Sequence, residues 1–261
     1  MYISYLFFSI WPLAYISGPF LSDLLLSFIA LNFAFISIKN RDLFFIKNKI
    51  FLLILFFYFC IITSSLFSGN ILFSLESSLF YFRFIFFAFG VAYLLIKYQN
   101  SLRNFAFSII IAYIILFLDG FYEFFNGSNV LGHSSMYDNR ISSFFLEEYV
   151  LGSYVSRFFP FLLISLLFVS KYLKNYKLTL FSSGFFVALP LVVISGERTA
   201  IFNIFLSIFI FLLNMKFKDL KKFLPTIIIS FSIVASMILI NPDYKHRFIN
   251  TTINQLTENT N

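Results

Sequence analysis

The chain has 261 residues, of which 60% are hydrophobic and 23% aromatic, and its mean hydropathy is +0.89. A soluble core of this length could not bury that much apolar surface, so the composition excludes an ordinary soluble domain and predicts an integral membrane protein. The formal net charge of +7 does not indicate nucleic-acid binding, because the basic residues fall in short clusters between apolar runs.

The apolar runs follow one another from the second residue onward. A helix needs roughly 17–25 apolar residues to cross the hydrocarbon core, and nine runs come close to that length. The runs are continuously apolar rather than alternating, which favours helices over strands. We therefore predict an all-α transmembrane bundle of about nine spans within residues 1–240. The spans are expected near residues 2–17, 20–38, 50–67, 78–96, 105–121, 150–170, 178–194, 200–215 and 223–240.

Most of the 19 basic residues lie in alternate loops: those after the second, fourth, sixth and eighth predicted spans. The positive-inside rule assigns such loops to the cytoplasm. The N-terminus is then cytoplasmic, whereas the long loop at about 122–149 and the polar tail at 241–261 are periplasmic.

A polar interruption, Ser195–Ala200, separates two of the apolar runs. Charge in hydrocarbon is costly, so Glu197 and Arg198 are expected in a turn at a membrane surface or beside a polar cavity. Two interpretations stay open. Glu197 and Arg198 either stabilise the turn as a pair, or Arg198 joins the first amides of the following helix in an anion site.

The basic residues outside the cytoplasmic loops are mostly arginines, whereas those loops favour lysine. A guanidinium matches the geometry of phosphate and carboxylate groups, so this contrast predicts anion recognition on the outer side. For Arg83 and Arg157, a purely structural role is as good an interpretation as anion recognition: each side chain either snorkels towards the surface or pairs with an acid. The set outside the cytoplasmic loops is Arg83, Arg140, Arg157, Arg198, Lys245 and Arg247.

Motifs for bound groups are missing from the sequence. His133 and His246 are isolated in polar segments, and the spacing of Cys and His residues fits no metal site. Walker A, GxSxG and GxGxxG runs are also absent. We therefore predict neither a metal nor a cofactor.

Four runs resemble, in order and spacing, the bacterial O-antigen ligase and O-antigen polymerase family over essentially the whole chain. They are SGPFLSD at 17–23, DGFYEFFNG at 119–127, DNRISSFFLEEYVLGSY at 138–154 and ISGERTA at 194–200. Ser142-Ser143 stands where the family usually has Ser-Gly, which makes the backbone of that loop a point of difference.

The resemblance implies a polytopic inner-membrane glycosyltransferase that acts without a metal or nucleotide sugar. Its donor would be a glycan linked to undecaprenyl pyrophosphate, and its acceptor another glycan or lipid A-core. The resemblance assigns the pyrophosphate to Arg157 and Arg198, and less directly to Arg140 and Arg83. Base assistance would come from Glu197, Glu148 or a residue outside this chain.

Family members continue through a large periplasmic loop, so the resemblance also implies that residues 241–261 begin a truncated loop. The chain would then be a fragment, a truncated gene product or a split protein. His246 precedes the region of the ligases' catalytic histidine and is not expected to replace it. Two alternatives remain: a polysaccharide or lipid transporter or flippase whose path the charges line, and a non-catalytic membrane scaffold.

Overall fold

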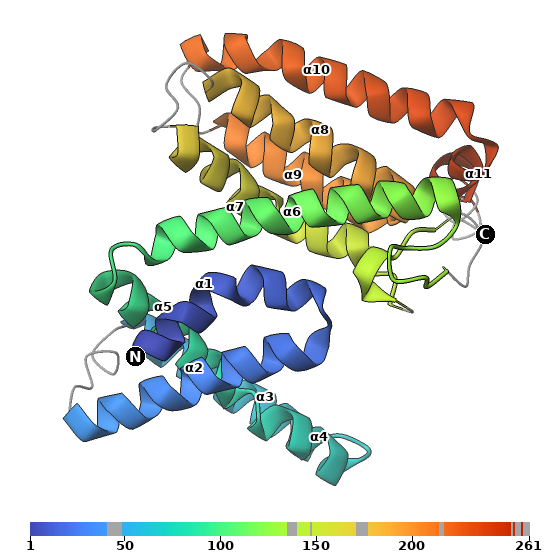
Figure 1. Ribbon diagram of the computed structural model, residues 1–261. Coiled ribbons are helices and arrows are strands. Elements are labelled where there is room, and N and C mark those ends of the chain that lie inside the picture. The colour runs from blue at the N-terminus through green and yellow to red at the C-terminus, as the bar shows by residue number, and fades with distance from the viewer. Residues whose placement is uncertain are drawn as a thin grey trace. The chain divides into compact units, whose positions relative to one another are not determined.

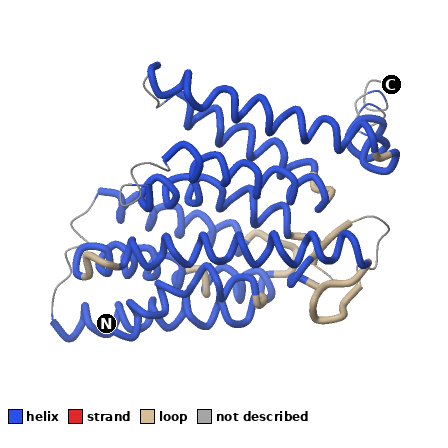
Figure 2. The backbone as a smooth tube through the Cα atoms, turned by 45° about the horizontal axis from the view of Figure 1, so that its top comes forward, coloured by secondary structure: helices blue, strands red, loops and turns tan. Residues whose placement is uncertain are grey.

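The computed structural model describes all residues except 41–48, 135–139, 147, 171–176, 214–216, 252, 254–256 and 258–261. The described residues form helices joined by turns and loops, with no β-strand among them (Figure 2). The all-α prediction is therefore confirmed. The chain divides into two compact units, Met1–Phe105 and Ala106–Asn261, and each is described by itself.

The first unit contains α1 (Tyr2–Ile16), α2 (Pro19–Asn40), α3 (Lys49–Leu66), α4 (Ile71–Leu79), α5 (Phe82–Lys97) and the start of α6. Helix α2 packs against α1 and α5, and α3 packs against α4. At Gly90 of α5, an added Cβ would lie 3.2 Å from the Cβ of Phe33 and 3.3 Å from Cγ2 of Ile29. The absence of a side chain at Gly90 therefore allows α2 and α5 to approach closely.

The second unit contains most of α6 (Ser101–Asn126), a 3₁₀ turn η2 (Ser143–Phe145), α7 (Leu151–Ser170), α8 (Lys177–Ser195), α9 (Arg198–Leu213), α10 (Phe217–Ile240), α11 (Pro242–Lys245) and a π-helical turn η4 (His246–Asn250) (Figure 1). Helix α8 packs against α7 and α10, and α7 also packs against α9. Phe159, Phe185 and Leu163 are fully buried between these helices. The start of α7, the end of α8, the start of α9 and the end of α10 meet at one end of this unit.

Six stretches of the described residues are long and apolar enough to cross a membrane. They are Pro19–Asn40, Lys49–Leu66, Ile71–Lys97, Ser101–Asn126, Leu151–Ser170 and Lys221–Ile240. Three further apolar helices are shorter: Tyr2–Ile16, Thr179–Ser195 and Arg198–Leu213. With 15 residues, α1 is about 22 Å long, less than the ~30 Å of the hydrocarbon core. The chain is thus an all-α membrane protein, but the count of about nine spans is not supported.

The span expected near residues 78–96 also differs in detail, because the structure has two helices there. Between α4 and α5, Tyr81 N donates to Ser78 O at 3.2 Å and Arg83 N donates to Phe80 O at 3.2 Å. These bonds join residues three positions apart, whereas α-helical bonds join residues four apart. The backbone between α4 and α5 is therefore a tighter, 3₁₀-type turn.

Candidate functional site

The interruption at Ser195–Ala200 is a tight turn between α8 and α9, as expected from the sequence. Helix α8 ends at Ser195, and α9 begins at Arg198. Gly196 has φ +68° and donates its N–H to Val193 O at 3.0 Å. Glycine adopts this left-handed conformation without the steric cost that a Cβ would add, which explains the residue at this position.

Glu197 links this turn to the first turn of α7. Its Oε1 accepts a hydrogen bond from Gly152 N at 2.8 Å, and its Oε2 accepts one from the hydroxyl of Ser153. The first N–H groups of a helix lack partners within the helix, and its positive end favours a carboxylate. Both oxygens of Glu197 are therefore engaged in capping α7.

Gly152 allows this contact because it has no side chain. An added Cβ would overlap Oγ of Ser195 and lie 3.0 Å from the Cβ of Glu197. The α8–α9 turn thus lies directly against the backbone at the start of α7.

Two arginines from distant parts of the chain lie over Gly196. Arg140 donates its Nε–H to Ser195 O at 3.3 Å, and Arg247 of η4 donates its Nε–H to Gly196 O at 2.6 Å. A Cβ added to Gly196 would lie 3.1 Å from Nε of Arg247 and 3.5 Å from Cγ of Arg140. The guanidinium carbon of Arg140 is also 4.5 Å from the centre of the Tyr149 ring.

Arg198 belongs to the same group of charges. Burial lowers the pKa of Arg247 from its usual value, the positive charges of Arg140 and Arg198 lower it further, and the negative charge of Glu197 opposes them. We call Arg140, Arg198 and Arg247 the arginine cluster. Like charges held this close repel one another, so the cluster favours a bound anion.

The loop that carries Arg140 is anchored on two buried acids of α6. Asp119 accepts hydrogen bonds from Val130 N at 2.9 Å and from the hydroxyl of Ser143. Glu123 accepts from the backbone N–H groups of Ser142, at 3.2 Å, and Ser143, at 2.6 Å. These bonds fix the chain two and three residues after Arg140.

Ser143 has φ +53°, the left-handed conformation that favours glycine. Ser143 is therefore a non-glycine residue in a conformation that glycine would adopt more readily. The hydroxyl of Ser143 bonds to Asp119, and its carbonyl accepts from Nδ2 of Asn129 at 3.0 Å. These two hydrogen bonds hold Ser143 in that conformation.

Arg157 and Glu148 have no hydrogen bond or ion pair with the arginine cluster among the described residues. Arg157 is exposed on α7 and has neither a hydrogen bond nor an ion pair with any residue that the structure describes. Glu148 is exposed in the segment before α7, next to the Tyr149 that stacks on Arg140.

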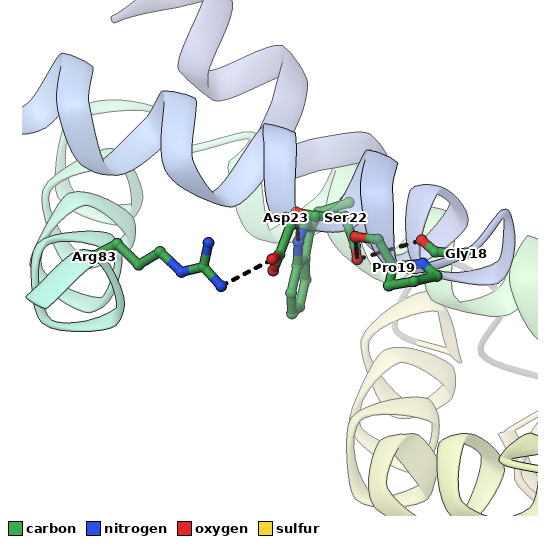
Figure 3. Close-up of polar contacts among 6 residues, drawn as sticks. Gly18, Pro19, Ser22, Asp23 and Arg83 are labelled. Carbon is green, nitrogen blue, oxygen red and sulfur yellow. Dashed lines mark hydrogen bonds and ion pairs between the residues drawn. The ribbon is translucent and has the colours of Figure 1, made fainter. Parts of the chain in front are cut away.

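Arg83 belongs to the first unit, where it pairs with an acid. Its Nη2 donates to Oδ2 of Asp23 at 2.8 Å, linking α5 to α2 (Figure 3). Its guanidinium carbon also lies 5.0 Å from the ring centre of Phe84. The sequence left open whether Arg83 snorkels towards the surface or pairs with an acid, and in the structure it pairs with Asp23.

Sequence reasoning counted Arg247 among the outer basic residues without assigning it to the pyrophosphate, and it did not select Asp119 or Glu123. For Arg247 the sequence holds no local signal, since the contact with Gly196 joins residues 51 positions apart. For Asp119 and Glu123 the signal is their spacing: two acids one helical turn apart in an otherwise apolar helix face the same neighbour.

Among the described residues, no group of three or more His, Cys, Asp or Glu side chains is arranged to hold a metal ion. Comparisons with protein-family models, curated proteins and solved structures found no match for this chain.

Proposed function

We propose that this chain is a membrane glycosyltransferase of the O-antigen ligase or polymerase type, or the N-terminal part of one. Its substrate would be a glycan linked to undecaprenyl pyrophosphate in a bacterial inner membrane. The observation that carries the proposal is the arginine cluster. Arg140, Arg198 and Arg247 surround one turn, and a pyrophosphate is an anion that several guanidinium groups bind well.

The proposed orientation places the arginine cluster on the periplasmic face. Lys221 and Lys222 lie near the start of α10, whereas Arg247 of the cluster lies seven residues after the end of this helix, so these lysines and the arginine cluster are at opposite ends of α10. Positive-inside bias assigns the lysine end to the cytoplasm, which also places the N-terminus there and residues 241–261 in the periplasm.

We also propose that α1, α8 and α9 cross the membrane, which would restore nine crossings. The support for α8 is its packing against both α7 and α10, which are long enough to span. A helix somewhat shorter than the hydrocarbon core is accommodated by local thinning of the bilayer.

In the proposed reaction, an acceptor hydroxyl attacks the anomeric carbon of the donor sugar while the bond to the pyrophosphate breaks. The leaving pyrophosphate takes the bonding electron pair, and the arginine cluster stabilises the charge that develops on it. The hydroxyl proton passes to a base. Both oxygens of Glu197 already accept hydrogen bonds from α7, so Glu148 or a group outside this chain is the better candidate for that base.

The test measures binding of inorganic pyrophosphate to the purified full chain in detergent by titration calorimetry. Arg198→Ala and Arg140→Ala are each expected to weaken binding by about 10- to 100-fold, the value of a hydrogen bond to a charged group. Lys245→Ala is the control, because this exposed lysine is two residues from Arg247 but has no side-chain hydrogen bond or ion pair with the described residues. A wild-type chain that does not bind pyrophosphate would refute the proposal.

A cellular measurement then distinguishes the enzyme from the alternatives. In cells that produce the chain, Arg198→Ala and Arg157→Ala are expected to reduce surface polysaccharide while protein levels stay normal. Unchanged polysaccharide would favour the scaffold, and donor accumulating on the cytoplasmic side would favour a flippase.

A further inference from the structure

The loop after α6 presents apolar side chains on its surface. Val130 and Leu131, in a turn of this loop, expose 63% and 64% of their surface, and Phe125 in the last turn of α6 exposes 77%. Phe125 ends a stripe of exposed apolar residues that recur every three or four positions along α6: Ile111, Ile115, Leu118 and Tyr122. In a helix long and apolar enough to span a membrane, such a stripe fits contact with lipid.

The backbone of this loop satisfies its own hydrogen-bond donors. All five N–H groups of residues 129–133 donate within the chain. Oδ1 of Asn129 accepts two of them, from Leu131 at 3.0 Å and from His133 at 2.9 Å. Water bonds the free N–H groups of an ordinary surface loop, whereas in hydrocarbon each N–H needs a partner within the protein. The loop therefore meets the requirement of a lipid environment, although Leu131 is exposed.

A hydrogen bond from Val130 N to Oδ1 of Asp119, at 2.9 Å, sets the depth of the loop. Asp119 lies seven residues before the end of α6, so the loop folds back along this helix (Figure 1). Arg103, near the start of α6, marks the opposite membrane surface, because charge is costly in hydrocarbon. Asp119 is 16 residues further along, about 24 Å, which is less than the ~30 Å of the hydrocarbon core. The backbone of Val130 is therefore level with the hydrocarbon.

We propose that residues 127–133 form a membrane-inserted loop, in which Val130 and Leu131 enter the acyl-chain region of the leaflet at the C-terminal end of α6. The partner is lipid rather than another protein, because the loop lies at hydrocarbon depth and next to the lipid-facing stripe of α6. Through the hydrogen bond from Nδ2 of Asn129, the inserted loop also holds the segment that carries Arg140 close to the bilayer. The inference requires that α6 crosses the membrane and does not depend on the proposed glycosyltransferase.

The test places a fluorophore on the loop of the full chain, in vesicles of phosphatidylethanolamine and phosphatidylglycerol. Cys60→Ser removes the one cysteine of the sequence, so that Leu131→Cys alone carries an NBD group. We expect blue-shifted NBD emission and a loss of fluorescence with nitroxide-labelled lipids. The loss should be larger for nitroxides near the top of the acyl chain than for those at its end. Iodide in the aqueous phase should cause little loss.

Two further positions calibrate the measurement. Phe57→Cys lies in the middle of α3, which has no buried residue and is long enough to span, so nitroxides deep in the bilayer should quench it most. Lys245→Cys is exposed in the segment after α10, so iodide should quench it and the lipid nitroxides should not. A Tm equal to that of the wild type confirms that each labelled variant is folded.

The outcomes separate this inference from the proposed function. Iodide quenching at Leu131→Cys as strong as at Lys245→Cys would refute the inserted loop and leave the proposed function standing. An NBD group at Leu131→Cys that neither quencher reaches would also refute it, because protein would then cover the loop. If Phe57→Cys escapes the lipid nitroxides as well, the chain does not span the bilayer, and both proposals are wrong.

Discussion

Removing the Glu197 carboxylate tests whether this residue joins the α8–α9 turn to α7. Glu197→Ala deletes the acceptor for Gly152 N and for the hydroxyl of Ser153. A hydrogen bond to a charged group contributes about 1.5–3 kcal/mol to stability. A carboxylate at a helix N-terminus contributes about 0.3–1 kcal/mol more. At this half-buried site, water can take over some of the lost hydrogen bonds. We therefore expect Glu197→Ala to lower the free energy of unfolding by about 2–4 kcal/mol.

Glu197→Gln keeps the shape of the side chain. Its amide oxygen accepts from Gly152 N and its amide nitrogen donates to the hydroxyl of Ser153, so only the charge is lost. We expect this variant to cost about 1 kcal/mol. We therefore expect the free energy of unfolding to fall from the wild type to Glu197→Gln and further to Glu197→Ala.

The assay is thermal unfolding of the full chain in detergent together with hydrogen exchange of the first turn of α7. At roughly 2–4 °C per kcal/mol, Glu197→Ala should lower Tm by about 4–16 °C and accelerate exchange at Gly152 and Ser153. Thr199→Ala, an exposed position in the same turn, is the control. Equal Tm values for Glu197→Ala and Thr199→Ala, with unchanged exchange in α7, would refute the capping role.

Further predictions concern the loop, the α7 contact and the C-terminal segment. Ser143→Ala and Ser143→Gly both lose the hydrogen bond to Asp119, but only glycine relieves the positive φ, so the glycine variant should be more stable by about 1 kcal/mol in the same unfolding assay; equal stability would contradict the strain. Gly152→Ala should lower Tm because its Cβ would overlap the α8–α9 turn, whereas Gly69→Ala, with open space around it, should not. Burial, and then the negative charge of the preceding aspartate, raise the pKa of Tyr244 from 10.0 to about 12. Tyr244 therefore contributes stability that is complete below pH 10 and is lost as the pH rises through 12. The fall in Tm over that range should be smaller in Tyr244→Phe than in the wild type; identical falls would show that Tyr244 is not the group responsible.

Much of the helical architecture follows from local sequence. The turn between α1 and α2 is an example: Gly18 has φ +114°, and Pro19 is the first residue of α2. The break between α4 and α5 was not predicted. No Gly or Pro marks Phe80 and Tyr81, and the hydropathy is continuous across them.

The candidate site was predictable only in part. Ser195–Ala200 stood out because it places charge between apolar runs, and Arg140 and Arg198 were selected as outer-side arginines. Their proximity to each other and to Arg247 depends on contacts between residues more than 50 positions apart, which no local pattern encodes. Arg83, chosen by the same reasoning, instead pairs with Asp23.

The sequence by itself determined that this protein is an all-α membrane protein and, apart from the break between α4 and α5, about where its helices lie, because apolar run length and helix-breaking residues act over a few turns. The tertiary structure alone decided what each charge contacts. Glu197 caps α7, Asp119 and Glu123 hold the loop that carries Arg140, and Arg247 joins the α8–α9 turn. The physical reason is that hydrogen bonds and charge pairs act at short range in space, so their partners are fixed only when distant helices pack together.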